Sequence, residues 1–311
     1  MILTVCPNTA LDRILFIEEW IPGTPMRTDR IVTSVGGKGL NSAVVLRHLG
    51  VETVGMGFFA GEIGKELVGI VQEYGILLEA IWVGGTNRVS HVIVESKNKR
   101  HSHVIAGQPR ISKEQKREFI DRFRERVQEA EWVIFGGSIP KSLDNDFYKE
   151  LIPITQAANV PTLVDSQKSF IIEAIKTKPD IVKLNWEEFE WTFNKNAETL
   201  DSLIKQAEDI FKEHELKNMV ITLGEDGILA FTEEGAYLAK VPPQEPKNAA
   251  GAGDAVSSAL VWRFSLGDDW ESALRWASAV GAASVLTERT GDVFQEDIDR
   301  ILPMVTVRKI L

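Results

Sequence analysis

The chain has 311 residues, of which 44% are hydrophobic and 26% charged, with a formal net charge of −10 at pH 7. This composition is ordinary for a globular protein with a substantial core, and the negative charge argues against general binding of nucleic acid or of anionic membranes. The one cysteine, Cys6, has no partner for an internal disulfide. The sequence also shows neither a signal peptide nor an apolar run of about 18 residues, so we expect a cytoplasmic protein without a membrane span.

From about residue 35 onward, strand-like and helix-like segments alternate. The predicted strands are residues 53–57, 132–135, 162–165, 181–184 and 219–223, followed by a hairpin of 228–232 and 236–241. The predicted helices are residues 65–74, a segment from a capping box at Ser112 and Gln115 to about 130, and 200–211, where apolar residues recur at helical spacing. This alternation predicts an α/β fold with a mostly parallel sheet covered by helices on both faces.

Two regions, residues 12–34 and 88–106, interrupt this alternation. Each has the pattern of two short strands joined by a turn, and the second turn is the basic segment Lys97-Asn98-Lys99-Arg100. We expect the two regions to form one small inserted sheet that closes over a site as a lid and excludes water from it. An exposed face of this sheet would be a natural surface for a homodimer.

The most informative motif is Gly251-Ala252-Gly253-Asp254, which follows a proline-rich loop and opens a long apolar segment. Small residues at the start of a helix expose backbone N–H groups that bind anions. An aspartate beside the bound anion could accept a proton from an incoming hydroxyl, as phosphoryl transfer requires. The alternative interpretation is an ordinary helix start after a loop.

A second glycine cluster is Gly36-Gly37-Lys38-Gly39-Leu40-Asn41. Its glycines permit close approach of the backbone to a ligand, and Lys38 places a cation that suits a phosphate or a polyhydroxy ligand. The alternative is a tight turn from a strand to a helix with a solvated lysine. The cluster is not a P-loop, because the sequence contains no Gly-x-x-x-x-Gly-Lys-Ser/Thr.

Two later segments follow predicted strands. In Lys183-Leu184-Asn185-Trp186-Glu187-Glu188, Asn185 and Glu188 offer oxygen ligands for Mg²⁺, directly or through water, but an N-cap asparagine with a capping glutamate fits equally well. Thr222-Leu223-Gly224-Glu225-Asp226-Gly227 could admit an adenine or a ribose, although by itself it is an ordinary turn.

A rival interpretation comes from Gly55-Met56-Gly57-Phe58-Phe59-Ala60, which fits a relaxed dinucleotide fingerprint with Glu79 near the place of a ribose-binding acid. It would make the protein an NAD-dependent oxidoreductase. The bulky pair Phe58-Phe59 argues against it, because the backbone there should closely approach a pyrophosphate.

The order of these motifs is more specific than any one of them. Asn8 and Asp12, then GGKGLN, an arginine at position 88, Gly137-Ser138-Ile139-Pro140, KLNWEE, TLGEDG and GAGD together resemble the ribokinase-like (PfkB) carbohydrate kinase family over essentially the whole chain. GGKG, and GSIP followed by Asp144-Asn145-Asp146-Phe147-Tyr148, resemble its 1-phosphofructokinase and tagatose-6-phosphate kinase branch.

The resemblance implies a single ribokinase-like kinase domain over residues 1–311, with a lid from 12–34 and 88–106, and with ATP and Mg²⁺ as cofactors. The implied catalytic base is Asp254, and the implied anion hole is formed by the N–H groups of Gly251, Ala252 and Gly253. The implied substrate-binding residues are Asp12, Gly36, Gly37, Asn41 and Ser138 for the sugar, and Lys38 and Arg88 for the phosphate it already carries. The implied ATP-side residues are Lys183, Thr222, Gly224 and Gly227, with Asn185 and Glu188 organising Mg²⁺, through water in our interpretation.

These matches predict an ATP-dependent kinase that phosphorylates a hydroxyl of a phosphorylated ketose, with fructose 1-phosphate or tagatose 6-phosphate as leading candidates. An unphosphorylated sugar or a nucleoside is the alternative substrate. Asn87-Arg88-Val89-Ser90 departs from the more usual Thr-Arg-x-Asn, which leaves the identity of the sugar open. His101 and His103 are either solvated lid residues or part of the recognition of the substrate phosphate.

Overall fold

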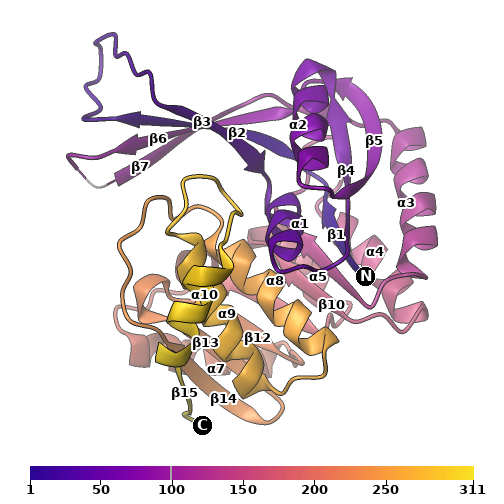
Figure 1. The fold of residues 1–311 in the computed structure, drawn as a ribbon. Coiled ribbons are helices and arrows are strands. Elements are labelled where there is room, and N and C mark those ends of the chain that lie inside the picture. Colours follow the sequence, from indigo (N-terminus) through magenta and orange to yellow (C-terminus); the bar gives the residue numbers. More distant parts are fainter. Residues whose placement is uncertain (99) are drawn as a thin grey trace.

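The computed structural model describes residues 1–98 and 100–311, and in this part of the chain the strands form two sheets (Figure 1). The main sheet has eleven strands. In spatial order they are β15 (Thr306–Lys309), β14 (Gly235–Lys240), β13 (Ile228–Thr232), β12 (Met219–Thr222), β11 (Ile181–Asn185), β10 (Thr162–Asp165), β9 (Trp132–Gly136), β1 (Ile2–Cys6), β4 (Thr53–Ala60), β5 (Leu77–Gly85) and β8 (Pro109–Arg110). Seven neighbouring strands run parallel to one another, namely β12, β11, β10, β9, β1, β4 and β5.

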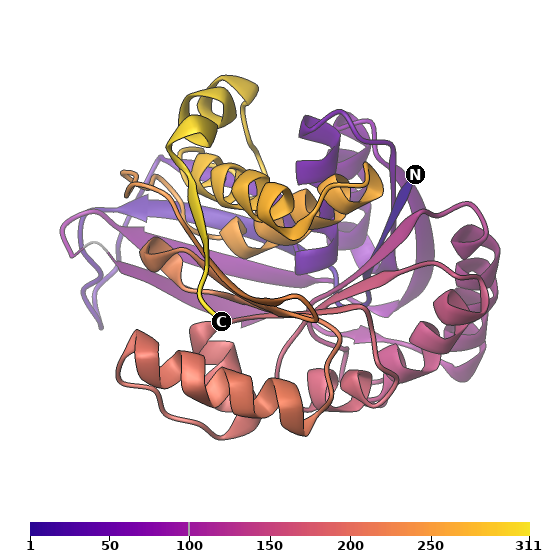
Figure 2. The same ribbon diagram turned by 90° about the horizontal axis from the view of Figure 1, so that it is seen from below.

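Helices cover both faces of this sheet (Figures 1 and 2). The described α-helices are α1 (Lys38–His48), α2 (Gly61–Glu73), α3 (Lys113–Val127), α4 (Phe147–Ala157), α5 (Lys168–Ile175), α6 (Trp186–Phe193), α7 (Leu200–Glu213), α8 (Ala252–Ser265), α9 (Trp270–Ser284) and α10 (Gln295–Ile301). Because side chains alternate along a strand, Val133 and Phe135 of β9 enter the core under α3 to α7, and Ile134 enters the core under α8 to α10. The predicted α/β fold is confirmed.

The second sheet contains the two regions that interrupt the alternation. Its order is β3 (Ile31–Gly36), β2 (Ala10–Ile17), β6 (Arg88–Glu95) and β7 (Arg100–Ala106). Strand β2 pairs in parallel with β6, so segments about 75 residues apart in sequence lie side by side, and the sheet projects from the body of the molecule (Figure 1). We call this sheet the lid. Lys99 of the predicted basic turn and the side chain of His101 lie outside the described residues.

The structure corrects several expectations. The segment proposed as a dinucleotide fingerprint lies inside β4, where Phe58 and Phe59 are fully buried, so it forms no glycine turn. Glu79 instead pairs with Arg126 of α3. The oxidoreductase interpretation is therefore wrong. The helix predicted at 65–74 begins at Gly61, and α3 ends at Val127, although both hydrogen bonds of its capping box form. No helix within the described residues combines the length and apolarity needed to cross a bilayer.

Candidate active site

The first turn of α8 is the centre of the candidate site. Gly251 caps the helix in the left-handed conformation (φ 84°), which favours glycine. A Cβ atom at Gly253 would lie 2.5 Å from the Lys183 amine, so a side chain at this position would displace the end of Lys183. The turn therefore brings backbone N–H groups without helical partners close to the sheet, where their partial positive charge can bind an anion.

Asp254 lies in this turn and is 5% exposed. Asn41 of α1 donates a hydrogen bond from its Nδ2 to Asp254 Oδ2 at 2.8 Å. Burial and then the negative charge of Asp165 raise the pKa of Asp254 to about 7, while Lys38 and Lys183 act in the opposite direction. A carboxyl group with a pKa near neutrality suits a general base, because it is ionised at working pH and still accepts a proton.

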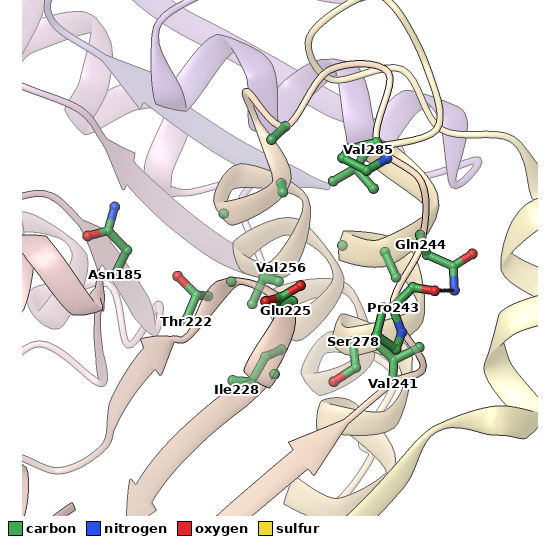
Figure 3. Close-up of a pocket in the computed structure, with 18 of the residues that line it drawn as sticks. Asn185, Thr222, Glu225, Ile228, Val241, Pro243, Gln244, Val256, Ser278 and Val285 are labelled. Carbon is green, nitrogen blue, oxygen red and sulfur yellow. Dashed lines mark hydrogen bonds between the residues drawn. The ribbon is translucent and has the colours of Figure 1, made fainter. Parts of the chain in front are cut away.

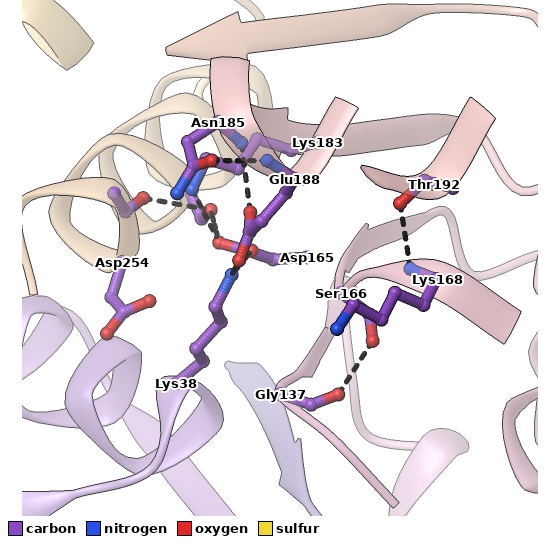
Figure 4. A network of polar contacts seen from close by, with 12 residues as sticks. Lys38, Gly137, Asp165, Ser166, Lys168, Lys183, Asn185, Glu188, Thr192 and Asp254 are labelled. Carbon is purple, nitrogen blue, oxygen red and sulfur yellow. Dashed lines mark hydrogen bonds and ion pairs between the residues drawn. The ribbon is translucent and has the colours of Figure 1, made fainter. Parts of the chain in front are cut away.

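Asp165, at the carboxyl end of β10, connects the groups around Asp254 (Figure 4). Its carboxylate accepts hydrogen bonds from Lys38 Nζ at 2.6 Å, from Lys183 Nζ at 2.9 Å and from Ser257 Oγ at 2.8 Å. Burial would raise the pKa of Asp165, but Lys183 and Lys38 outweigh this effect and lower it to about 2. Asp165 therefore stays ionised and holds the Lys38 and Lys183 amines close to Asp254.

Lys38 bridges two carboxylates. Its amine also donates to Glu188 Oε1 at 2.7 Å, and Asp165 and Glu188 together raise its pKa although burial opposes them. The other oxygen of Glu188 accepts from the Asn185 N–H at 2.9 Å, and Asn185 Oδ1 accepts from the Glu188 N–H at 2.7 Å. The capping box proposed as the alternative for this pair therefore forms. It leaves the amide nitrogen of Asn185 directed away from the box.

A cavity of about 360 Å³ lies on one side of the α8 turn (Figure 3). We call it the apolar cavity, because most of its wall is aliphatic. Its polar edge contains Asn185, Thr222, Gly224, Gly227 and Gly253, and its apolar wall includes Val241, Pro243, Val256 and Val285. Loops after neighbouring strands thus meet the helix start at the carboxyl edge of the sheet, which is the usual place for ligands in open α/β sheets.

A second cavity of about 210 Å³ lies between α1, the lid and the loop after β9. We call it the polar cavity. Its walls include Asp12, Gly37, Lys38, Asn41, Arg88 and Ser138, together with Ser90, His103 and Ile105 of the lid. Six of the seven substrate-binding residues predicted from the resemblance therefore line one cavity. Gly36, the seventh, packs directly against the Asp12 carboxyl group.

Several polar atoms around this cavity are buried without a hydrogen-bond partner among the described residues. They are Asn8 Oδ1, Asn41 Oδ1 and Arg88 Nε. Other atoms of these residues fix their side chains, because Asn8 Nδ2 donates to Ser138 Oγ at 2.9 Å and Arg88 Nη2 donates to the Asn8 carbonyl at 2.9 Å. Buried polar groups normally have partners, so these atoms indicate a polar ligand. Burial raises the pKa of Asp12 to about 7 in the same region.

The turn of α8 lies where the two cavities meet. Gly253 lines the apolar cavity, and the next residue, Asp254, bonds to Asn41, which lines the polar cavity. A ligand group placed at this turn would face backbone amides on one side and a carboxylate on the other. The arrangement suits transfer of an anionic group from a ligand in one cavity to a ligand in the other.

The residues predicted for ATP and Mg²⁺ do not all line one cavity. Thr222, Gly224 and Gly227 line the apolar cavity as expected for the ATP side, but Lys183 is 1% exposed and lies beneath the α8 turn, paired with Asp165. Their roles stay predictions. Asn185 and Glu188 as magnesium ligands likewise stay a prediction. In the part of the chain that the structure describes, no three acidic, histidine or cysteine side chains are grouped so that they could hold a metal ion.

Sequence reasoning missed Asp165, which the network depends on. The segment 162–165 was predicted as a buried strand, and its final residue was given no role. The available signal was an ionisable residue at the carboxyl end of a parallel strand, where the ligands of such sheets gather. The sequence allows two interpretations of His103, and the structure places this residue in the wall of the polar cavity.

Comparison with known proteins identifies the family. The model of the pfkB family of carbohydrate kinases matches residues 5–297, so the chain belongs to this family. Its members are phosphotransferases with an alcohol group as acceptor that act on sugars or sugar phosphates, generally with ATP and Mg²⁺. The chain is 27% identical over 310 residues to the 1-phosphofructokinase of Bacillus subtilis, covering 100% of both chains. It is 23% identical to a tagatose-6-phosphate kinase of Staphylococcus epidermidis, again covering 100% of both.

Solved structures confirm the ribokinase-like fold. A possible 1-phosphofructokinase from Thermotoga maritima superposes with a TM-score of 0.90 at 24% identity, covering 100% of this chain and 99% of that one. The tetrameric inhibited form of phosphofructokinase-2 from Escherichia coli superposes with a TM-score of 0.85 at 22% identity, covering 97% and 98%. At these identities the likeness concerns the fold, and the substrate must be argued from the site.

Proposed function

We propose that this protein transfers the γ-phosphate of ATP to a hydroxyl of a phosphorylated ketose, with fructose 1-phosphate or tagatose 6-phosphate as the leading candidates. One observation carries the proposal. Asp254, a buried carboxyl group with a pKa near 7, lies at the α8 turn where an apolar and a polar cavity meet. A base next to an amide-lined turn between two ligand cavities suits phosphoryl transfer better than binding alone, because binding needs no base.

ATP is assigned to the apolar cavity. The aliphatic wall formed by Val241, Val256 and Val285 fits a flat purine, and the turn at Gly224–Gly227 leaves space for the ribose. The phosphates would then point toward the N–H groups of α8. Asn185 and Glu188 would hold Mg²⁺ through water, since this ion usually keeps several waters and binds one or two protein oxygens plus phosphates. When bound, Mg²⁺ neutralises charge on the transferring group.

The sugar phosphate is assigned to the polar cavity. Asp12 and Asn41 would bind sugar hydroxyls, and the unpartnered Nε of Arg88 would donate to the phosphate already on the sugar. Asp254 accepts the proton of the attacking hydroxyl, while the amides of Gly251, Ala252 and Gly253 stabilise the negative charge of the transferring group. Lys38 lines the polar cavity and contributes positive charge there, beside Asp165 and Glu188.

An unphosphorylated sugar or nucleoside is the second candidate substrate. The observation that favours it is the position of the Lys38 amine, which is held by Asp165 and Glu188 rather than directed to an open phosphate site. Arg88 favours the phosphorylated ketose, because a buried guanidinium nitrogen facing a neutral ligand would lack a charged partner.

A substrate panel tests the proposal. Wild-type protein would be incubated with Mg·ATP and with each of several matched phosphorylated and unphosphorylated ketoses and nucleosides, and ADP release would be measured. We expect release that depends on a phosphorylated ketose and is lost without Mg²⁺. Turnover only with unphosphorylated acceptors would establish the second candidate, and no turnover with any acceptor would contradict the kinase assignment.

We also propose that residues 1–311 act as one kinase domain and that the lid forms a homodimer through its outer face. Side chains of that face line a shallow groove that contains Leu15, Ile17, Trp20, Ile93 and Val104, and Val104 is 52% exposed. Burying such residues against a second copy would remove apolar surface from water. Sedimentation of wild-type protein and of Val104→Glu tests this, because only the variant should be monomeric.

A further inference from the structure

We infer that His103 of the lid binds the phosphate of the substrate that is not transferred, and so selects phosphorylated over unphosphorylated sugars. The inference rests on the proposed function and adds a specificity residue to it. His103 is exposed at the lid edge of the polar cavity, opposite the reaction centre.

The register of the lid strands gives its two faces different compositions. Asp12 of β2 pairs with Ser90 of β6, and Ser90 pairs with Ile105 of β7, so these three side chains lie on one face of the lid. His103 precedes Ile105 by two positions in β7 and therefore lies on the same face. The His103 ring leans along this face, with Nδ1 3.5 Å from Ser90 Oγ. Asp12, Ser90 and His103 thus form a polar row across three strands, directed into the cavity. His91 lies on the opposite face, in the wall of the outer groove.

The two ends of the polar cavity receive different parts of a substrate. At one end, Asn41 bonds to Asp254, so the reacting hydroxyl must lie there. Ser90 of β6 and His103 of β7 line the same cavity from the lid. In a ketose phosphorylated at one terminal carbon and attacked at the other, the existing phosphate is remote from the reacting hydroxyl. The phosphate would therefore lie toward the lid, within reach of Arg88 and of His103.

The charges around the cavity explain why a further donor is needed. The Lys38 amine is shared between Asp165 and Glu188, and one nitrogen of Arg88 is held by the Asn8 carbonyl. Asp12 places a carboxyl group in the same wall, which would repel a phosphate when ionised. An imidazole N–H of His103, oriented by Ser90, adds a donor that compensates for Asp12.

The experiment compares His103→Ala with His91→Ala, a matched control that removes the same side chain from the other face of the lid. For each protein, kcat and KM would be measured with the phosphorylated ketose, with its unphosphorylated counterpart and with ATP. We expect His103→Ala to raise KM for the phosphorylated ketose about tenfold or more, the effect of losing one hydrogen bond to a charged group. KM for ATP and for the unphosphorylated sugar should match the control. His103→Gln, which keeps a neutral donor, should recover part of the loss.

The outcomes separate this inference from the proposed function. If wild-type protein phosphorylates a sugar phosphate but His103→Ala behaves like His91→Ala, the inference is overturned and the proposed function stands. An equal rise in KM for the phosphorylated and unphosphorylated sugars also overturns it, because the contact would then be to the sugar. If wild-type protein neither binds a sugar phosphate in calorimetry nor turns it over, both proposals fall.

Discussion

The two cavities beside the α8 turn are built in different ways. The apolar cavity is formed by ends of strands in the main sheet, by the turns that follow them, and by α8 and α9. Its polar edge comes from short continuous segments such as Thr222 to Gly227. The polar cavity combines β2, α1, β6, β7 and the loops after β9 and β10, so its lining extends from Ala10 to Gln167. The first belongs to the body of the fold, and the second is closed by a separate sheet.

This difference suggests a division of roles. Residues of the body should fix the nucleotide and support stability, and residues of the lid should decide which acceptor is used. Three residues lie at the boundary between the body and the lid, namely Asp254, Asp165 and Lys38. Variants of these residues therefore test whether the two regions act separately.

The largest expected effect concerns Asp165. Asp165→Ala would leave Lys183 buried without its carboxylate, since both side chains are 2% exposed and 2.9 Å apart. Removing one partner of a buried ion pair costs about 3–5 kcal/mol. Denaturant unfolding should show a loss of this size in the free energy of unfolding. Arg126→Ala, which removes a partly exposed pair with Glu79 (side chains 30% and 15% exposed), is the control and should cost about 1 kcal/mol or less. Equal stability of the two variants would contradict the central role of Asp165.

The next effect concerns chemistry rather than stability. Asp254→Asn keeps the shape of the side chain but removes the proton acceptor, so kcat should fall on the order of 10²-fold or more. Circular dichroism and thermal unfolding should show an intact fold, because no positively charged partner is left alone. Turnover near the wild-type value in a well-folded variant would refute Asp254 as the base.

Lys38 tests the separation of the cavities. Lys38→Ala should raise KM for the sugar phosphate far more than KM for ATP, because Lys38 lines the polar cavity and is not among the residues that line the apolar one. Arg88→Ala, on the lid side of the same cavity, provides the comparison and should show the same pattern. Equal changes in both KM values for Lys38→Ala would show instead that its amine serves the two ligands together, as its bridge between Asp165 and Glu188 allows.

The smallest expected effect is a dependence on pH. The pKa of Asp254 is raised to about 7, so the group is protonated and inactive as a base below that value. For the free enzyme, kcat/KM should therefore be about tenfold lower at pH 6 than at pH 8. Asp12, whose pKa is also raised to about 7, is a second carboxyl group near the site that titrates in this range. In Asp12→Asn, kcat/KM should still fall below pH 7. If kcat/KM of the wild-type protein did not change between pH 6 and pH 8, this would argue against Asp254 as the base.

The fold could be predicted from the sequence because its signals are local. Apolar strands alternate with amphipathic helices, and the capping residues Ser112 and Gln115 mark a helix start that the structure contains. The turn of α8 is predictable for the same reason, since its small residues are consecutive in sequence and the left-handed backbone at Gly251 favours glycine. The lid was predicted from regions where the alternation fails.

What the sequence could not provide depends on contacts between distant segments. Asp165 differs from an ordinary residue at a strand end only because Lys38, 127 positions earlier, reaches it. In the same way, the register of β6 and β7 decides that His103 faces the polar cavity and His91 the outer groove. The rival fingerprint at Gly55–Ala60 arises because glycines within a buried strand have the same spacing as those of a phosphate-binding turn.

The central claim is that a phosphoryl group passes across the α8 turn to a sugar phosphate in the polar cavity. Phosphorus NMR of wild-type protein with Mg·ATP and the accepted ketose phosphate tests it most directly. We predict that each ADP formed is matched by one new phosphomonoester on the sugar, and that Asp254→Asn forms neither at a comparable rate. Release of ADP with inorganic phosphate in place of a sugar bisphosphate would contradict the account.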